Sequence, residues 1–223
     1  INSKIKRDRI LYNLLMVYKA DIVALLDTRI GSSVEDRICS TYDVRIYSSR
    51  PVQRPDHHPS RGTSIMVSRR LEFKPLDMVR DANGNLLSIK AKINSSLIVI
   101  TAVYAPNRDC IERNQFYERV FDVTCQWGLS NMVICGDFNC ALNFELETKN
   151  YSTENEANRL GREKLLALLD LYDFYDPLRE LRPGEKIWTW KAGLDQFNTI
   201  NSTANLTNEK RARIDYVFIS SGT

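Results

Sequence analysis

The segment Met132-Val133-Ile134-Cys135-Gly136-Asp137-Phe138-Asn139 is the most informative part of this sequence. Its apolar first half is typical of a strand that is buried on both faces, and Gly136 allows the backbone to turn after it. Asp137 and Asn139 stand two positions apart, so their side chains project from the same side if the chain stays extended. An acid and an amide at a strand end can hold a water molecule and a metal ion. An Asp at a turn can also be a simple local cap.

Strand and helix patterns alternate on both sides of this segment. Apolar residues that recur three or four positions apart predict helices over about residues 4–19, 109–127 and 154–171. Strands are predicted over 21–26, 42–47, 63–67, 87–93, 97–104 and 214–219, with a hairpin turn at Asn83-Gly84-Asn85. Residues 191–213, rich in Asn, Thr and Ser, favour an exposed loop or a long hairpin. The alternation predicts one domain over residues 1–223, with mixed sheets and helices outside them.

Composition excludes several classes of protein. The 223 residues are 43% hydrophobic and 26% charged, within the range of ordinary globular domains. No apolar run approaches the roughly 18 residues that suggest a membrane span, and the polar, basic start lacks the apolar core of a signal peptide. We therefore expect an intracellular protein whose five cysteines are reduced. A formal net charge of +3 permits a nucleic-acid partner if the basic residues cluster.

Polar residues follow the other apolar strands in the same way as Asp137. The motifs are Leu26-Asp27-Thr28, Ser60-Arg61-Gly62, Tyr104-Ala105-Pro106-Asn107, Trp188-Thr189-Trp190 and Arg213-Ile214-Asp215-Tyr216. Polar groups at the ends of several strands suggest convergence on one cleft. In this order the motifs resemble the endonuclease/exonuclease/phosphatase superfamily, in particular the apurinic-type endonuclease domain of LINE-type non-LTR retrotransposons. The resemblance runs through nearly the whole chain, and it depends on the order, because each motif alone is weak.

The resemblance implies both a fold and an activity. The fold is a four-layer α/β sandwich of two mixed β-sheets flanked by helices, as in DNase I-like proteins. The activity is that of a metal-dependent DNA endonuclease that nicks a phosphodiester for target-primed retrotransposition. Mg²⁺ is the implied cofactor, with Mn²⁺ as a possible substitute. The implied partners are double-stranded DNA and a reverse transcriptase domain in the same polyprotein, with no membrane, and the implied localisation is nuclear after cytoplasmic synthesis.

The resemblance also implies roles for single residues. Asp27 would bind the metal ion, Tyr104 would touch the scissile phosphate, and Asp137 would orient or deprotonate the attacking water. Asn139 would help to fix the water and the phosphate, and Asp215 would orient a catalytic histidine. DNA contacts are expected for Arg61, Asn107, Arg108, Thr189, Trp190, Arg211 and Arg213. These roles suit the chemistry, because phosphodiester cleavage requires charge neutralisation and a positioned water, and Mg²⁺ needs few carboxylates.

Three departures from the family pattern leave alternatives open. Asp27 stands where the family usually has Glu, and the chain has no counterpart of the family's first strand or of its final Ser-Asp-His segment. His57 and His58 stand in a proline-bounded turn and are expected to be a solvated pair. One alternative is a catalytically incomplete DNA-binding module derived from such a nuclease. The other is a phosphatase or phosphodiesterase of the same superfamily that acts on lipids, nucleotides or RNA.

Overall fold

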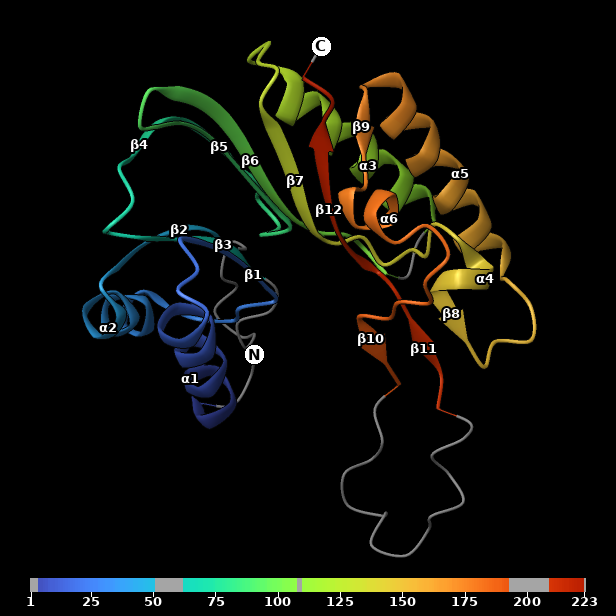
Figure 1. The fold of residues 1–223 in the computed structure, drawn as a ribbon, viewed down its shortest axis with the longest axis horizontal. Helices are drawn as coiled ribbons and strands as arrows, with labels where there is room; N and C mark the ends of the chain where they lie inside the picture. The colour runs from blue at the N-terminus through green and yellow to red at the C-terminus, as the bar shows by residue number, and fades with distance from the viewer. Residues whose placement is uncertain (1–3, 51–61, 108–109, 193–208, 223) are drawn as a thin grey trace, which may run out of the picture.

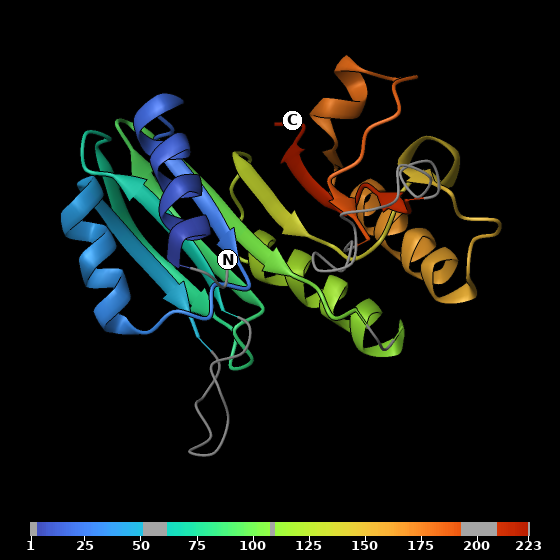
Figure 2. The same ribbon diagram turned by 90° about the horizontal axis from the view of Figure 1, so that it is seen from below.

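Two β-sheets lie face to face in this protein, and helices cover their outer faces (Figure 1). The computed structural model describes residues 4–50, 62–107, 110–192 and 209–222. Figure 2 shows the blue helices of the N-terminal part on one side of the strands and the green and orange helices on the other. The expected four-layer α/β sandwich with a DNase I-like fold is thereby confirmed.

The larger sheet has six strands in the order β4-β5-β6-β7-β12-β9. They are β4 (Phe73–Arg80), β5 (Leu86–Ile93), β6 (Ser96–Tyr104), β7 (Met132–Asp137), β9 (Phe174–Tyr175) and β12 (Asp215–Ser220). β6 and β7 are parallel because α3 (Cys110–Cys125) returns the chain between them, and the other neighbours are antiparallel. α3 and α5 (Glu156–Leu171) cover the outer face through a core that includes Phe121, Leu165 and Phe218.

The smaller sheet has the order β1-β3-β2 and is antiparallel throughout its described residues. Its strands are β1 (Ile22–Leu26), β2 (Val44–Ser49) and β3 (Thr63–Ser68). α1 (Lys4–Tyr12), the π-helical turn η1 (Asn13–Val17) and α2 (Ser32–Tyr42) cover its outer face with Leu11, Leu15 and Ile38. On the inner face, Ile65 and Val67 share a core with Ile89 and Ile100 of the six-stranded sheet. This core joins the two sheets.

A short third sheet, in the order β10-β11-β8, extends from one end of β12 (Figure 1). It consists of β8 (Thr148–Lys149), β10 (Trp190–Lys191) and β11 (Arg211–Ala212), and the short helices α4 (Phe144–Glu147) and α6 (Pro177–Leu181) lie nearby. β10 and β11 are antiparallel partners, so the ends of the expected loop over 191–213 form a hairpin base. Residues 193–208 lie outside the described residues.

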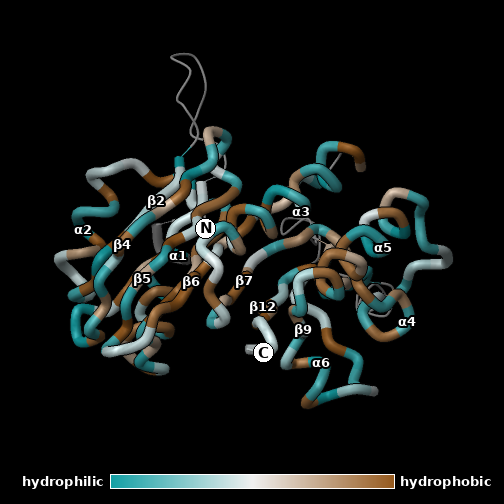
Figure 3. The backbone as a smooth tube through the Cα atoms, turned by 90° about the horizontal axis from the view of Figure 1, so that it is seen from above, coloured by the Kyte–Doolittle hydropathy of each residue, from teal (hydrophilic) through white to brown (hydrophobic). Residues whose placement is uncertain are grey.

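The sequence did not predict the short elements α4, β8, β9 and α6, nor the longer elements α2 and β4, whose local signals are weak. α2 buries only Ile38 fully and is mostly polar, and β4 is an edge strand that contains Pro75 and exposed residues. Figure 3 shows that the central strand β6 is far more hydrophobic than α2. The predicted helix over 4–19 is an α-helix as far as Tyr12 and a π-helical turn beyond it.

Two expectations from composition have structural counterparts. All five cysteines are free thiols, as expected. No helix within the described ranges has the length and apolar character needed to cross a membrane.

Candidate active site

Three expected catalytic residues lie side by side at one end of the six-stranded sheet. Tyr104 pairs with Asp137 across β6 and β7, and Asp137 pairs with Asp215 across β7 and β12. Residues in register on neighbouring strands point to the same face of a sheet. Asp215 lines a mostly apolar cavity of about 480 Å³ together with residues of β1, so this face is turned toward the smaller sheet. The row meets the end of β1, where Asp27 follows, and the negative charge of Asp27 reaches Asp137.

Gly136 allows β7 to approach β6 closely just before Asp137. Its φ is +147°, and a Cβ atom built at this position would lie 2.0 Å from the carbonyl oxygen of Val103. Val103 is the residue paired with Gly136 across the two parallel strands. Any larger residue would push the strands apart, so this glycine is required by the close backbone approach.

Asn139 turns back toward Asp137 and fixes its carboxylate. The Asn139 backbone N–H donates to Oδ1 of Asp137 over 2.8 Å, and Nδ2 of Asn139 donates to the carbonyl of Ala105 over 2.6 Å. Nη1 of the buried Arg113 donates to the carbonyl of Asn139 over 3.0 Å. The φ of Asn139 is +49°, a left-handed conformation that Asn tolerates better than most residues. The tip of β7 is therefore held from α3 and from the end of β6.

The pKa values of Asp137 and Asp215 in this row are raised above their ordinary range. Burial, together with the charges of Asp215 and Asp27, raises the pKa of Asp137 to about 7, although the hydrogen bond from Asn139 opposes the rise. Burial also raises the pKa of Asp215, although a hydrogen bond from Thr189 opposes this. Two partly buried carboxyl groups with raised pKa values on neighbouring strands are typical of a functional site.

Asp27 differs from the other two acids because it has a cation bound to it. Arg29 donates from Nε to Oδ1 over 2.9 Å and from Nη2 to Oδ2 over 2.8 Å. The hydrogen bond to Asp27 raises the pKa of Arg29 despite burial, and Tyr104 adds to the rise. The Asp27 side chain is 24% exposed, so solvent and ions can reach it. Any metal ion on Asp27 competes with Arg29.

The donor chemistry of the row fits Mg²⁺. Within the described ranges, no three His, Cys, Asp or Glu side chains lie close enough together to enclose a metal ion. Mg²⁺ does not need such a cage, because it binds through one or two carboxylates and keeps several waters. Asp27, whose partly exposed side chain lies close enough to Asp137 for its charge to be felt there, offers a carboxylate of this kind.

The residues expected to contact DNA differ in exposure, and some of them lie outside the described residues. Asn107 and Trp190 are exposed and line a cavity of about 280 Å³ next to Asn139. Arg211 is partly exposed, lies 5.6 Å from the centre of the Trp188 ring and pairs with Glu209. Their DNA contacts remain predictions, as does that of Thr189. Arg61 and Arg108 lie outside the described residues, as do His57 and His58.

Thr189 has a structural use that the sequence did not indicate. Its Oγ1 accepts hydrogen bonds from the backbone N–H groups of Ile214 and Asp215, both over 3.1 Å. The hydroxyl therefore fixes the start of β12, where Asp215 stands, while the residue itself stays exposed.

The expectation that Arg213 contacts DNA is corrected by its burial. The side chain is 1% exposed, and its Nη1 lies 2.9 Å from Oε1 of Glu147 and 2.7 Å from Oδ2 of Asp176. A guanidinium enclosed by two carboxylates in the interior cannot reach a phosphate of a bound duplex. The sequence showed only that Arg213 leads into the strand of Asp215, and this signal does not distinguish a surface cation from a buried one.

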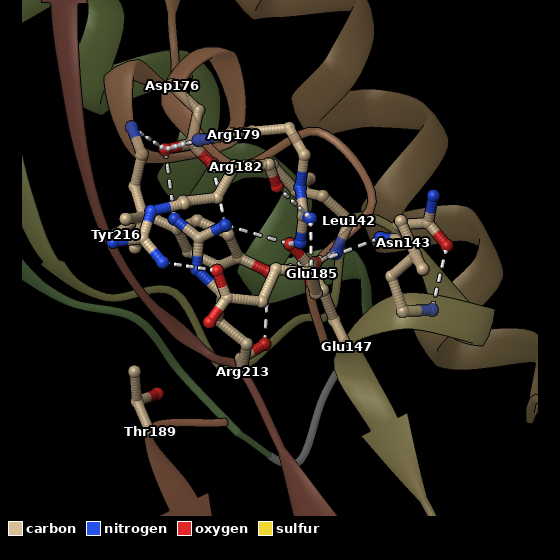
Figure 4. A network of polar contacts seen from close by, with 12 residues as sticks. Leu142, Asn143, Glu147, Asp176, Arg179, Arg182, Glu185, Thr189, Arg213 and Tyr216 are labelled. Atoms are coloured by element: carbon tan, nitrogen blue, oxygen red, sulfur yellow. Dashed lines mark hydrogen bonds and ion pairs between the residues drawn. The ribbon is translucent and has the colours of Figure 1, made fainter. Parts of the chain in front are cut away.

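Sequence reasoning missed the buried ion-pair network around Arg213. Its charged members are Glu147, Asp176, Arg179 and Arg213, and Tyr216 contributes a hydroxyl (Figure 4). One local signal exists, because Asp176 before Pro177 is a typical helix start and caps α6. No local signal marks Glu147 or its partner Arg213, which stand 66 residues apart.

A helix, sheet, sheet, helix sandwich with acids at the ends of its central strands defines a DNase I-like α/β protein with a candidate hydrolytic site. Residues 2–223 match the Endonuclease/Exonuclease/phosphatase family. The chain belongs to this family, whose members are hydrolases that act on phosphodiester bonds.

Solved structures show the same fold at low sequence identity. An AP endonuclease from Archaeoglobus fulgidus has a TM-score of 0.71 and 20% identity, over 99% of this chain and 84% of that one. A 3′ phosphatase from Neisseria bound to a product DNA hairpin has a TM-score of 0.70 and 17% identity, with the same coverage of 99% and 84%. The endonuclease domain of TRAS1, a telomere-specific non-LTR retrotransposon, has a TM-score of 0.60 and 13% identity, over 95% and 78%.

Proposed function

We propose that this chain is a Mg²⁺-dependent endonuclease that nicks a phosphodiester bond of double-stranded DNA. The observation that carries the proposal is the row of Tyr104, Asp137 and Asp215 on three adjacent strands, next to Asp27. Family membership supports phosphodiester hydrolysis as the reaction class.

Asp137 has the properties of a general base in this proposal. Its pKa of about 7 lies near the operating pH, where a base can both be ionised and accept a proton from water. The hydrogen bond from Asn139 fixes the orientation of the carboxylate, and burial, followed by the charge of Asp215, keeps its pKa high. Tyr104 stands beside Asp137 in the row, where its hydroxyl would bind the phosphate. Mg²⁺ held by Asp27, or Mn²⁺ in its place, would neutralise charge on the phosphate oxygens.

The short third sheet supports DNA as the substrate. It carries the cations Lys149, Lys191, Lys210 and Arg211 on or next to its strands. Glu209 stands among these cations and pairs with Lys191 and Arg211. Clustered cations beside the acidic row suit the phosphates on either side of a scissile bond. Trp190, which is 40% exposed on the same sheet, offers an aromatic face to the nucleic acid.

A plasmid-nicking assay tests the proposal. Supercoiled DNA is incubated with the wild type, with Asp137→Asn and with Asp36→Asn, each in Mg²⁺, Mn²⁺ or EDTA. Asp36 is an exposed acid of α2 and serves as a matched control. We expect metal-dependent nicking by the wild type and Asp36→Asn, and a loss of about 10³-fold or more in Asp137→Asn, because the base is removed. Equal nicking by Asp137→Asn would exclude the assigned role.

Two further assays separate the alternatives. Duplex DNA binding without nicking in either metal would favour the catalytically incomplete DNA-binding module. Phosphate release from a 3′-phosphorylated oligonucleotide without nicking would favour a phosphatase, the activity named for the Neisseria structure.

We also propose a retroelement setting for the nuclease. The DNA nick would prime reverse transcription at the target, with a reverse transcriptase domain in the same polyprotein and a nuclear site of action. The order of the sequence motifs and the likeness to the TRAS1 endonuclease domain support this part. Reading the open reading frame that contains this chain, and imaging the tagged full-length product in cells, test it. A frame without a reverse transcriptase would contradict it.

A further inference from the structure

We infer that Glu147 is a positioning residue that ties the loop after Asp137 to the start of the strand that carries Asp215. The inference rests on the proposed function of these two acids. Glu147 lies in α4, outside the acidic row, and is 1% exposed. It therefore acts through the groups to which it is hydrogen-bonded.

The Glu147 carboxylate accepts hydrogen bonds from three different parts of the chain (Figure 4). Oε2 accepts from the backbone N–H groups of Leu142 and Asn143 over 2.8 and 2.9 Å, and from the Tyr216 hydroxyl over 2.8 Å. Oε1 accepts from Nη2 of Arg179 over 2.8 Å and from Nη1 of Arg213 over 2.9 Å. One carboxylate thus joins the loop after β7, helix α6 and the start of β12.

On the side of Asp137, Glu147 holds the far end of the loop that this acid begins. The loop leaves β7 at Asp137, turns at Asn139 and reaches the two amides that Oε2 binds. Its near end is held by the hydrogen bonds of Asn139 described above. Loss of Glu147 would release the far end while leaving the near end in place.

On the side of Asp215, Glu147 binds residues before and after the acid. The backbone N–H of Arg213 donates to the Glu147 carbonyl over 2.8 Å, in addition to the guanidinium contact. The Tyr216 hydroxyl, which belongs to the residue directly after Asp215, contacts Oε2 and also receives the Leu142 amide over 3.0 Å. The backbone that carries Asp215 is therefore tied to the loop that follows Asp137.

The charges of the network explain why Glu147 stays ionised in the interior. Burial raises the pKa of Glu147, but hydrogen bonds from Arg179, the Asn143 amide and Tyr216, together with the charge of Arg213, outweigh burial and lower it. An amide at this position would turn an NH₂ group toward hydrogen-bond donors, whichever way it is oriented. Glu147→Gln keeps the size of the side chain, but the hydrogen bonds accepted by one of the two carboxylate oxygens are lost.

The test compares Glu147→Gln with Glu35→Gln in the nicking assay under single-turnover and steady-state conditions. Glu35 is a largely buried carboxylate of α2 that accepts from Ser48 Oγ over 2.6 Å and pairs with Arg50, on the other sheet. We expect Glu147→Gln to lower kcat by about 10 to 100-fold with KM changed less than about twofold, because misplaced reacting groups affect the chemical step. Glu35→Gln should leave both constants unchanged.

Tyr216→Phe provides a milder variant in case Glu147→Gln does not fold. It removes one hydroxyl from the network and keeps the ring, so we expect kcat to fall about 3 to 10-fold with KM unchanged. Amide hydrogen exchange provides a readout that needs no activity. The amides of Leu142 and Asn143 should exchange faster in Glu147→Gln at a denaturant concentration where the protein is still folded.

The outcomes separate this inference from the proposed function. Unchanged kcat in both variants, or a rise in KM with kcat preserved, would overturn the positioning role. A wild type that nicks no DNA would contradict the proposed function, and the exchange of Leu142 and Asn143 would then decide whether Glu147 holds the loop. Unchanged exchange in Glu147→Gln would overturn the inference in that case as well.

Discussion

Two groups of acids in this protein differ in how their charge is balanced: the network of Glu147 and Asp176, and the acidic row of Asp137 and Asp215 with Asp27 next to it. In the network, Glu147 and Asp176 face the cations Arg179 and Arg213. In the acidic row of Asp27, Asp137 and Asp215, Arg29 pairs with Asp27 at the rim. The pKa of Glu147 is lowered, because hydrogen bonds and cations outweigh its burial, whereas burial raises the pKa values of Asp137 and Asp215.

The difference separates a group of charges that is balanced within the protein from one that is suited to binding a ligand. Buried charges are costly unless they are paired and hydrogen-bonded, so a balanced network is a stable part of the structure. Neighbouring carboxylates that are partly buried destabilise the folded state when both are charged. Such groups are typical of sites that bind a cation or exchange protons. The network thus stabilises the frame, and the row carries the proposed chemistry.

Breaking the network should have the largest effect on stability. Arg213→Met removes the ion pair of Asp176 and leaves Glu147 with the partly exposed Arg179, so we expect the free energy of unfolding to fall by about 3–5 kcal/mol. Equilibrium unfolding in urea measures it. Arg159→Met, which breaks an exposed pair with Glu163 on α5, is the control and should cost less than about 1 kcal/mol. Similar losses in the two variants would refute the contrast between a buried network and a surface pair.

A pH series sharpens the comparison from the side of the acidic row. The folded pKa of Asp137, about 7, lies above its value of about 3.9 in an unfolded chain. The contribution of this group to the free energy of unfolding is therefore fully present below about pH 4, and it is lost as the pH rises through about 7. Glu147 has the opposite sign: its contribution is present above its unfolded pKa and is lost as the pH falls through the lower folded value.

Asp137→Asn isolates the first of these two contributions. Relative to the wild type, its free energy of unfolding should rise by about 4 kcal/mol between about pH 4 and about pH 8, because the difference of about three between the folded and unfolded pKa values is lost in a variant that cannot ionise there. Urea unfolding at several pH values measures the gain. Parallel pH curves for the two proteins would show that Asp137 titrates normally in the fold.

The smallest effect is expected at the rim of the row. Arg29→Met removes the cation that holds both oxygens of Asp27, so Mg²⁺ should bind about 3 to 10-fold more tightly, as expected for loss of a partly exposed competitor. Calorimetric titration with Mg²⁺ measures it. Arg69→Met, which removes a cation from the exposed pair with Asp43, is the matched control. Weaker binding in Arg29→Met would indicate that Arg29 supports the metal site.

Sequence patterns located most of the long strands and helices, because the signals for these elements are local. Buried strands such as β6 and β7 are short apolar runs, and α3 and α5 have apolar residues on one face, so neighbouring residues suffice to identify them. The polar residues Asp137 and Asn139 could be assigned to a strand end for the same reason. α2 and β4 escaped prediction, because a polar helix and an edge strand with a proline resemble loops.

The amino-acid sequence by itself determined which strands are buried and which polar residues follow them. Only the tertiary structure decided which of those residues meet. Strand pairing places Tyr104, Asp137 and Asp215 in one row. Packing encloses Arg213 with Glu147, which stands 66 residues away. An arginine before a strand can bind DNA at the surface or pair with a carboxylate in the interior. Which of the two occurs depends on residues far away in the sequence, and a local pattern carries no information about them.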